Sequence, residues 1–221
     1  MNNRRQYPTP PAVARALLIQ GHPRASSFNH ALGAAWADGA ERAGVPVETL
    51  VLAELDFDPR FRDDAKMVLE PDLATAQRLI ADAGHITVGF PVWWGSTPSL
   101  LKGFFDRVLQ TGWAFGRGQD GSYLRGLTGR SGRLLVTMDA PGWYDRLAYG
   151  RSAIRHVRDA TFKFCGIRPA KVTGFYGIEK TKETSREAML EKARSVGAAD
   201  ARTLLRRLPP AVDLRPAELA S

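Results

Sequence analysis

The sequence predicts an α/β fold in which a five-stranded parallel sheet is doubly wound, with helices on both faces. Short continuous apolar runs, each ended by glycine or by turn residues, recur along the chain and are typical of buried parallel strands. Segments with helical spacing of apolar residues separate these runs. Strands and helices that alternate at such spacings indicate a parallel sheet of βαβ units.

The first half of the chain supplies three strands and three helices. RALLIQGH is an apolar run ended by glycine, and Gly44 is placed to stop the helix that follows it. Asp72 is placed to cap the second helix and Gly84 to end it. We expect strands over residues 15–22, 45–52 and 85–90, helices over 26–44, 72–84 and 98–110, and an irregular connection over 53–70.

The second half supplies two more strands and two more helices after a glycine-rich connection. That connection covers residues 112–132, and no internal repeat is visible anywhere in the chain. We expect strands over residues 132–141 and 170–178 and helices over 150–166 and 182–208.

The 221 residues are expected to form one domain with a tail at each end. Three prolines and little periodicity predict a flexible N-terminal arm over residues 1–14, and further prolines mark a C-terminal tail over 209–221. The domain itself then spans residues 15–208. Two sheet orders are open at this point. The six-stranded dinucleotide fold requires G-x-G-x-x-G after the first strand, whereas GHPRASSFN has one glycine, and the order 2-1-3-4-5 does not need the motif.

Composition excludes several classes of function. A net charge of +8 suits a phosphate-bearing ligand, but no recognition motif accompanies it, so we expect no nucleic-acid partner. The four histidines lack ligand spacing and no CxxC is present, so we expect no metal. No apolar run approaches a membrane-spanning length, and no segment resembles a signal peptide. With one cysteine, Cys165, these features predict a cytoplasmic protein.

The loop after the first strand is a candidate phosphate site. Ser26, Ser27 and Asn29 lie where the next helix begins, and His22 and Arg24 add further donors. Hydroxyl groups and unpaired N–H groups at a helix N-terminus bind anions, and the helix dipole favours them. A serine at this place is also a common N-cap, so the local pattern leaves both interpretations open.

The loop after the third strand contains Trp93 and Trp94 next to a GST turn and Pro98. Tryptophan is often packed in a core, but the turn indicates that at least one of the two faces a crevice. In a 2-1-3-4-5 order the first and third strands are neighbours, so both loops border one ligand that carries a phosphate and a flat ring. The loop after the fourth strand adds polar groups that would reach the edge of such a ring. No Ser/His/Asp set has the spacing of a known hydrolase motif.

Four stretches together resemble the flavodoxin-like NAD(P)H:quinone oxidoreductase family, and its bacterial members above all. They are GHPRASSFN, FPVWWGSTPSLLKGFFDRV, VTMDAPGWYDRL and FKFCGIRPAKVTGFYGI, and the resemblance spans residues 16–205. The second is the most specific, because P-x₆-P-x-x-L-K-G-x-x-[DE]-R is long and contains little that propensity alone demands. The resemblance implies a flavodoxin-like fold, a flavin cofactor (FMN or FAD) and NAD(P)H as reductant.

The resemblance also implies roles for particular residues. Phosphate and ribityl contacts fall to His22, Ser26, Ser27, Phe28 and Asn29, ring contacts to Pro91, Val92, Trp93 and Trp94, and polar-edge contacts to Thr137, Met138, Asp139 and Ala140. Arg186 falls where relatives that bind FAD place an arginine near the far end of the cofactor. The family is typically a homodimer, so that Trp113, Phe115 and Tyr123 would border the partner's pocket.

The resemblance departs from the mammalian-type enzymes at one position. Tyr144 matches a catalytic tyrosine, but the residue six positions later is Gly150 where those enzymes have a histidine, and Tyr149 is a candidate replacement in the substrate pocket. The implied activity is two-electron, ping-pong reduction of quinones or similar acceptors. Two alternatives remain open: an ancillary regulatory subunit of a potassium-efflux system, and an electron carrier of flavodoxin type, which the sequence pI of about 10.0 disfavours.

Overall fold

Five parallel strands form a single sheet in the computed structural model, which describes residues 7–24, 26–61 and 69–210. Along the sheet the order is β2-β1-β3-β6-β7, so that in chain order the strands lie 2-1-3-4-5. This confirms the predicted fold class and decides between the two sheet orders. The strands are β1 (Ala16–Gln20), β2 (Val47–Val51), β3 (His85–Pro91), β6 (Ser131–Met138) and β7 (Ala170–Tyr176).

The three central strands are buried along their whole length, which is why the sequence reads there as continuous apolar runs. The outer strands β2 and β7 carry exposed or half-buried positions. Parallel pairing aligns Gln20 with Gly89 and Pro91 with Thr137, so the strands end at a common carboxyl edge.

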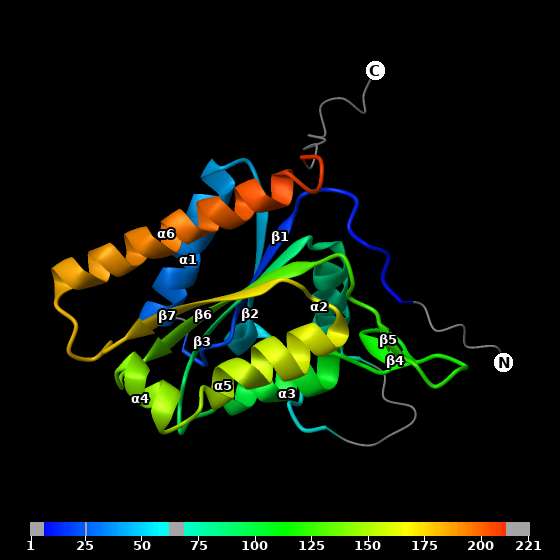
Figure 1. The fold of residues 1–221 in the computed structure, drawn as a ribbon, viewed down its shortest axis with the longest axis horizontal. Coiled ribbons are helices and arrows are strands. Elements are labelled where there is room, and N and C mark those ends of the chain that lie inside the picture. Colours follow the sequence, from blue (N-terminus) through cyan, green and yellow to red (C-terminus); the bar gives the residue numbers. More distant parts are fainter. Residues whose placement is uncertain (1–6, 25, 62–68, 211–221) are drawn as a thin grey trace.

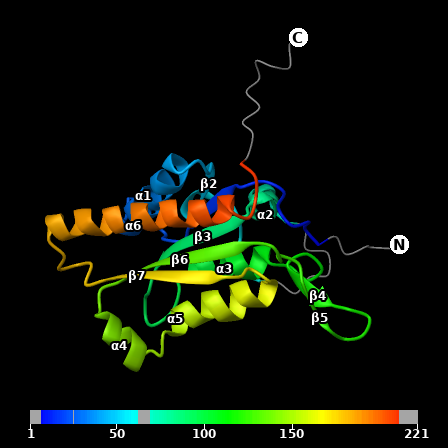
Figure 2. The ribbon, with the colours of Figure 1, turned by 45° about the horizontal axis from the view of Figure 1, so that its top comes forward.

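Helices cover both faces of the sheet (Figure 1). On one face, α1 and α6 pack over a core that includes Leu18, Leu135 and Phe175. On the other face, α2, α3 and α5 pack over a core that includes Leu17, Val88 and Leu134, and Figure 2 shows the same two layers after rotation. The helices are α1 (Phe28–Arg42), α2 (Pro71–Asp82), α3 (Ser99–Val108), α4 (Gly142–Leu147), α5 (Ser152–Arg155) and α6 (Glu183–Leu205).

The helices α1 and α6 approach each other backbone to backbone. A Cβ atom at Gly39 would lie 2.0 Å from the Arg194 carbonyl oxygen, and one at Gly197 would lie 2.0 Å from the Trp36 carbonyl oxygen. Neither position accepts a side chain without separating the helices. This contact holds the middle of α6 against the second half of α1 on the same face of the sheet.

Three elements differ from the prediction. Residues 112–132 were expected as a glycine-rich connection but contain an antiparallel hairpin of β4 (Phe115–Arg117) and β5 (Tyr123–Arg125). The short helix α4 was not predicted, and the middle of the expected helix over 150–166 is a π-helical segment, η2 (His156–Lys163). A 3₁₀ turn, η1 (Leu52–Glu54), lies in the predicted irregular connection, of which residues 62–68 fall outside the described part of the chain.

The prediction that Asp72 caps the second helix is wrong. The N-cap is Glu70, Pro71 begins the helix, and Asp72 Oδ2 instead accepts the N–H of Asp56 at 2.7 Å. Pro71 has no N–H and its fixed φ suits the first helical position, so the helix begins one residue earlier than expected. Asp72 instead fixes the loop before the helix through its bond to Asp56.

Residues 7–14, the described part of the predicted N-terminal arm, run along the domain. Ala14 N–H donates to the Pro209 carbonyl at 2.8 Å, so the segments next to the two ends of the domain meet. The domain boundaries at residues 14–15 and 208–209 stay predictions. No helix within the described ranges is long and apolar enough to cross a membrane.

Candidate functional site

Loops from four adjacent strands meet at the carboxyl edge of the sheet. Their described residues are 21–24, 26 and 27 after β1, 92–98 after β3, 139–141 after β6 and 177–182 after β7. Val92 N–H donates to the Thr137 carbonyl at 2.8 Å, and Glu179 N–H donates to Asp139 Oδ1 at 2.9 Å. The first bond joins the second loop to the end of β6, and the second bond joins the third loop to the fourth.

His22 lies in the first loop with its ring buried. Its Nδ1 accepts the N–H of Arg24 at 2.9 Å, and burial, Arg24 and His30 lower its pKa, so the ring is neutral at pH 7. A neutral histidine that accepts at Nδ1 carries its proton on Nε2, which makes that nitrogen a hydrogen-bond donor. The ring also packs edge-on against Trp93 at a centroid distance of 5.3 Å, which links the first loop to the second.

The start of α1 presents the predicted anion site. Ser26 is exposed, and Ser27 is the N-cap, its Oγ accepting the His30 N–H at 3.3 Å. Ser27 thus fulfils the capping interpretation, while its hydroxyl hydrogen can still donate. The first-turn N–H groups of a helix lack partners within the helix and suit an anion.

Asn29 has a supporting position instead of a surface one. Its side chain is 2% exposed, and Nδ2 donates to Thr137 Oγ1 at 3.2 Å. This bond fastens the first turn of α1 to β6, and it also uses the Thr137 hydroxyl inside the protein. The predicted contacts of both side chains with a cofactor stay predictions.

Arg186 brings a cation to the start of α1. Its guanidinium Cζ lies 5.3 Å from the centroid of the Phe28 ring, and its Nε is buried with no hydrogen-bond partner among the residues that the structure describes. A buried, unpaired guanidinium nitrogen favours an anionic ligand, because an unpaired buried donor is costly. Arg186 is 157 positions beyond Asn29 in the chain, and the fold brings the two helix starts together.

The tryptophan pair forms a tight turn on the surface. Trp93 and Ser96 exchange two backbone hydrogen bonds, at 3.0 and 2.9 Å, around Trp94 and Gly95, which both have positive φ values of 52° and 69°. Trp94 is 99% exposed and Trp93 43% exposed, whereas Pro91 and Val92 are buried beneath them. An L-residue in this conformation is strained, and a fully exposed tryptophan forgoes apolar burial. Both costs point to a flat ligand that covers the turn.

Aromatic side chains after β6 extend this surface. Tyr144 lies on α4, 38% exposed, and packs edge-on against Tyr149 at 5.4 Å. The Tyr149 ring lies against Gly95, where an added Cβ atom would be 3.2 Å from it, and Ser152 Oγ donates to the Gly95 carbonyl. The structure therefore brings Tyr144 and Tyr149 next to the tryptophan turn.

The remaining polar-edge residues divide between interior and surface. Met138 is buried, Ala140 is half-buried, and one carboxylate oxygen of Asp139 is occupied by the β7–α6 loop. Among the predicted polar-edge residues, only the backbone groups of Asp139 and Ala140 stay available to a ligand. Trp143, at 64% exposure, also belongs to this surface, although the resemblance gave it no role.

The predicted partner-pocket residues lie elsewhere. Phe115 and Tyr123 are on the β4–β5 hairpin, with Trp113 just before it, at the opposite end of the molecule from α4 (Figure 1). Phe164 packs against Phe115 at 5.1 Å and Tyr123 at 5.7 Å. We call Phe115, Tyr123 and Phe164 the aromatic patch. The resemblance assigned no role to Phe164, although it stands in the FCGI stretch that signalled the family.

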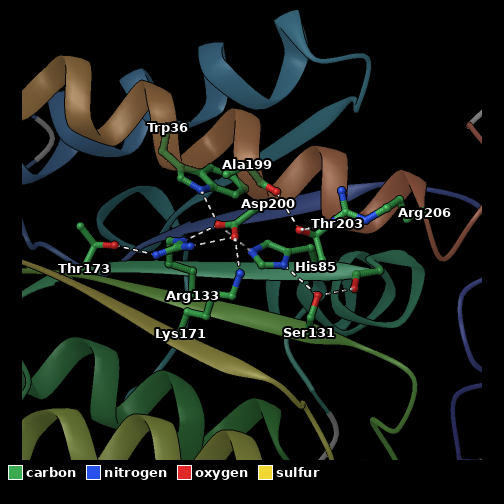
Figure 3. Close-up of polar contacts among 11 residues, drawn as sticks. Trp36, His85, Ser131, Arg133, Lys171, Thr173, Ala199, Asp200, Thr203 and Arg206 are labelled. Atoms are coloured by element: carbon green, nitrogen blue, oxygen red, sulfur yellow. Dashed lines mark hydrogen bonds and ion pairs between the residues drawn. The ribbon is translucent and has the colours of Figure 1, made fainter.

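A second polar cluster lies under α1 and α6, remote from the carboxyl edge (Figure 3). Asp200 accepts from Trp36 Nε1 at 3.2 Å and from Arg133 through both Nε and Nη2, while His85 Nε2 lies 3.5 Å away. His85 Nδ1 contacts Ser131 Oγ at 2.8 Å. Ser131, His85 and Asp200 thus form a chain that resembles a hydrolytic triad.

This cluster is structural. Ser131, His85 and Asp200 are 3–6% exposed, which leaves no access for a substrate. Burial lowers the pKa of His85 to about 4, so the ring is neutral at pH 7. Burial alone would raise the pKa of Asp200, but the hydrogen bonds from Arg133 and the charges of His85 and Arg133 lower it. Within the described ranges no group of three His, Cys, Asp or Glu side chains could hold a metal, and burial raises the pKa of the Cys165 thiol to about 12.

Comparison with known proteins covers nearly the whole domain. The pattern of a family described as having a flavodoxin-like fold matches residues 14–196. An uncharacterized NAD(P)H oxidoreductase of Haemophilus influenzae is 26% identical over 197 residues, which cover 86% of this chain and 97% of that protein.

Two further relatives carry more specific names. The ribosyldihydronicotinamide dehydrogenase [quinone] of Mus musculus is 26% identical over 207 residues, covering 81% of this chain and 88% of that protein. The general stress protein 14 of Treponema denticola, solved in complex with FMN, superposes with a TM-score of 0.59 at 26% identity, covering 86% of this chain and 99% of that one.

Proposed function

Since this chain belongs to the flavodoxin-like fold family, we propose that it is a flavin-dependent NAD(P)H oxidoreductase that reduces quinones or similar acceptors. The observation that carries the proposal is one edge of the sheet that combines an anion site with an exposed tryptophan turn. The oxidoreductases and the FMN-bound protein among its relatives support the assignment.

The residues at the edge fit a flavin in both of its parts. His22 Nε2–H, the first-turn N–H groups of α1 and the unpaired Nε of Arg186 suit a phosphate. Trp93 and Trp94 offer apolar area to one face of a flat ring. When bound, a flavin supplies hydride transfer, while the protein binds and orients it.

The chain's own residues then have separate tasks. Ser27 and Asn29 fix the start of α1, and the Trp93–Ser96 turn positions the ring face. The hydroxyl of Tyr144 would donate a hydrogen bond to a bound flavin, which gains negative charge on reduction. NAD(P)H and the acceptor occupy the same open face in turn, which gives ping-pong kinetics.

We propose further that the protein works as a homodimer in the cytoplasm. The β4–β5 hairpin, which carries Phe115 and Tyr123, lies at the opposite end of the molecule from α4 (Figures 1 and 2), and Tyr149, which follows α4, packs on Gly95 of the tryptophan turn. Tyr123 is 57% exposed and Phe164 39% exposed, which is unusual for clustered aromatic residues unless a second surface covers them. In the dimer, this patch closes the partner's site. The single, buried thiol suits a reducing compartment.

Tyr144→Phe is expected to slow flavin reduction by NAD(P)H about 10-fold in stopped-flow measurements, with flavin affinity nearly unchanged. The expected loss is below the roughly 100- to 1,000-fold caused by deleting a single oxyanion donor, because the backbone near Asp139 also faces the edge. Tyr149→Phe is the companion variant, because it leaves the ring packed on Gly95 and tests whether the Tyr149 hydroxyl, the candidate replacement for the histidine, shares this task.

A rate for Tyr144→Phe within a factor of two of wild type would remove Tyr144 from the mechanism. The wild-type protein in the same experiment tests the proposed oxidoreductase activity. Quinone-dependent NADH or NADPH oxidation by the purified, flavin-loaded protein is expected. Its absence would favour an ancillary subunit or an electron carrier.

A further inference from the structure

The segment over residues 7–13 lies outside the part of the chain that the family pattern matches, yet it packs against the β4–β5 hairpin. Figures 1 and 2 both show it beginning beside the hairpin before it passes to β1. A Cβ atom at Gly116 would lie 2.1 Å from Tyr7 Oη, and one at Gly126 would lie 2.8 Å from Tyr7 Cδ1. Tyr7 therefore fills the space that a side chain at Gly116 would need, and it shares the space beside Gly126 with the Trp113 carbonyl.

The same segment is also fastened to the domain directly after Tyr7. Arg130 is fully buried, and its Nη2 donates to the Thr9 carbonyl at 2.8 Å while its Nε donates to the Ile80 carbonyl at 3.1 Å. Pro10 lies against Gly129, where an added Cβ atom would be 3.0 Å away. One buried guanidinium thus joins the N-terminal segment to the end of α2, directly before β6.

The hydroxyl of Tyr7 makes no hydrogen bond to the described residues around it. Its oxygen is also buried. A buried unpaired hydroxyl costs stability, so Tyr7 holds the hairpin by packing and not by a hydrogen bond.

The hairpin carries two of the three members of the aromatic patch. Phe115 neighbours Gly116 in β4, and Tyr123 pairs with Arg117 across the hairpin. Phe164 is held separately, at the end of the π-helical segment η2. The geometry of the patch therefore depends on where the hairpin is held, and Tyr7 is packed on the hairpin.

We propose that residues 7–14 are a strap and that Tyr7 is a positioning residue, which holds the hairpin so that the aromatic patch closes the acceptor pocket of the partner subunit. The proposal rests on the proposed function and the dimer. It adds that acceptor binding in one subunit depends on the N-terminal segment of the other.

Gly116→Ala tests the strap, because Tyr7 supplies all three of the nearest atoms that the new methyl group would meet. The variant is expected to raise the KM for a quinone about 10- to 100-fold, the scale of loss when binding groups are misplaced by about 1 Å, with kcat at saturating quinone and flavin content unchanged. Trypsin is expected to cleave faster at Arg117 and Arg125 of the loosened hairpin. Tyr7→Ala should give the same two changes.

Tyr7→Phe supplies the rescue. It removes Oη and leaves Cζ at 3.3 Å from the new methyl group, a contact that a small adjustment accommodates. Tyr7→Phe alone should match wild type, and Tyr7→Phe with Gly116→Ala should return both KM and cleavage rate to within about twofold of wild type. Val196→Ala, which removes packing in the middle of α6, away from the Ala14–Pro209 bond, controls for lost stability and should leave KM unchanged.

The experiments test the strap, the positioning role of Tyr7 and the proposed function separately. An unchanged cleavage rate in Gly116→Ala, or failure of Tyr7→Phe to restore it, overturns the strap. Rescue of cleavage with an unchanged quinone KM overturns the positioning role. A wild-type protein that does not oxidise NAD(P)H overturns the proposed function instead, and the cleavage assay still tests the strap.

Discussion

Replacing Asp200 by alanine is expected to lower the free energy of unfolding by about 3–5 kcal/mol. Asp200 is 3% exposed and is the only carboxylate, among the described residues, that forms an ion pair with Arg133. Its removal leaves the Trp36 N–H and the buried Nε and Nη2 of Arg133 without their acceptor. Removing one partner of a buried pair is costly because the other charge stays in a poorly solvated place.

An exposed ion pair on the surface serves as the control for the buried one. Asp106 and Lys102 on α3 form an exposed pair four residues apart, for which a loss of about 0.3–0.5 kcal/mol is expected on Asp106→Ala. Reversible denaturant unfolding measures both variants. The double variant Arg133→Met with Asp200→Leu, which removes both charges, should be less destabilised than Asp200→Ala. A loss below about 1 kcal/mol for Asp200→Ala would show that the cluster does not hold α6 on the sheet.

Replacing Arg186 by glutamine is expected to raise the Kd for FMN about 10- to 100-fold. A hydrogen bond to a charged group contributes about 1.5–3 kcal/mol, and each 1.4 kcal/mol corresponds to a factor of ten. Arg186 has the unpaired buried Nε beside Phe28, at the start of α1. The measurement is fluorescence titration of flavin-free protein.

Riboflavin separates a phosphate contact from a general loss of structure, because it has the same ring and no phosphate. Its affinity should be the same for wild type and Arg186→Gln. Arg194→Gln, two turns further along α6, removes a guanidinium that pairs with Asp38, and it should leave FMN affinity unchanged. Equal weakening of FMN and riboflavin by Arg186→Gln would place the phosphate elsewhere.

The central strands were predictable because a strand that is buried on both faces of the sheet has a continuous apolar sequence. Residues 85–90 and 132–141 are such runs, and both are fully buried strands at nearly those bounds. Helix starts were predictable only where one side chain makes the cap. Ser27 does so, but at the second helix the proline decides the start and the cap makes no side-chain bond.

Elements without a local period were missed. The strands of the β4–β5 hairpin have three residues each, too short for alternation to be visible, and glycine-rich sequence around them is typical of a loop. The strap was predicted as part of a flexible arm because it also lacks a periodic pattern. Its packing depends on Gly116 and Gly126 having no side chains, which the strap's own sequence does not reveal.

The site was predictable as a set of loops and less so as a set of side chains. The order 2-1-3-4-5 places the loops of the first and third strands together, which the pattern of elements allows one to expect. Whether Asn29 faces a ligand or β6 depends on the packing of α1, and the meeting of Phe28 with Arg186 depends on α6. The chain of Ser131, His85 and Asp200 likewise joins three distant segments and has no signature in the sequence.

The mass of the small molecule released by denaturing the purified protein tests the central claim most directly. The account predicts FMN or FAD, non-covalently bound at one per chain, since each chain has one start of α1 and one tryptophan turn at its carboxyl edge. A protein that releases no flavin, and that stays colourless after incubation with both FMN and FAD, would contradict it.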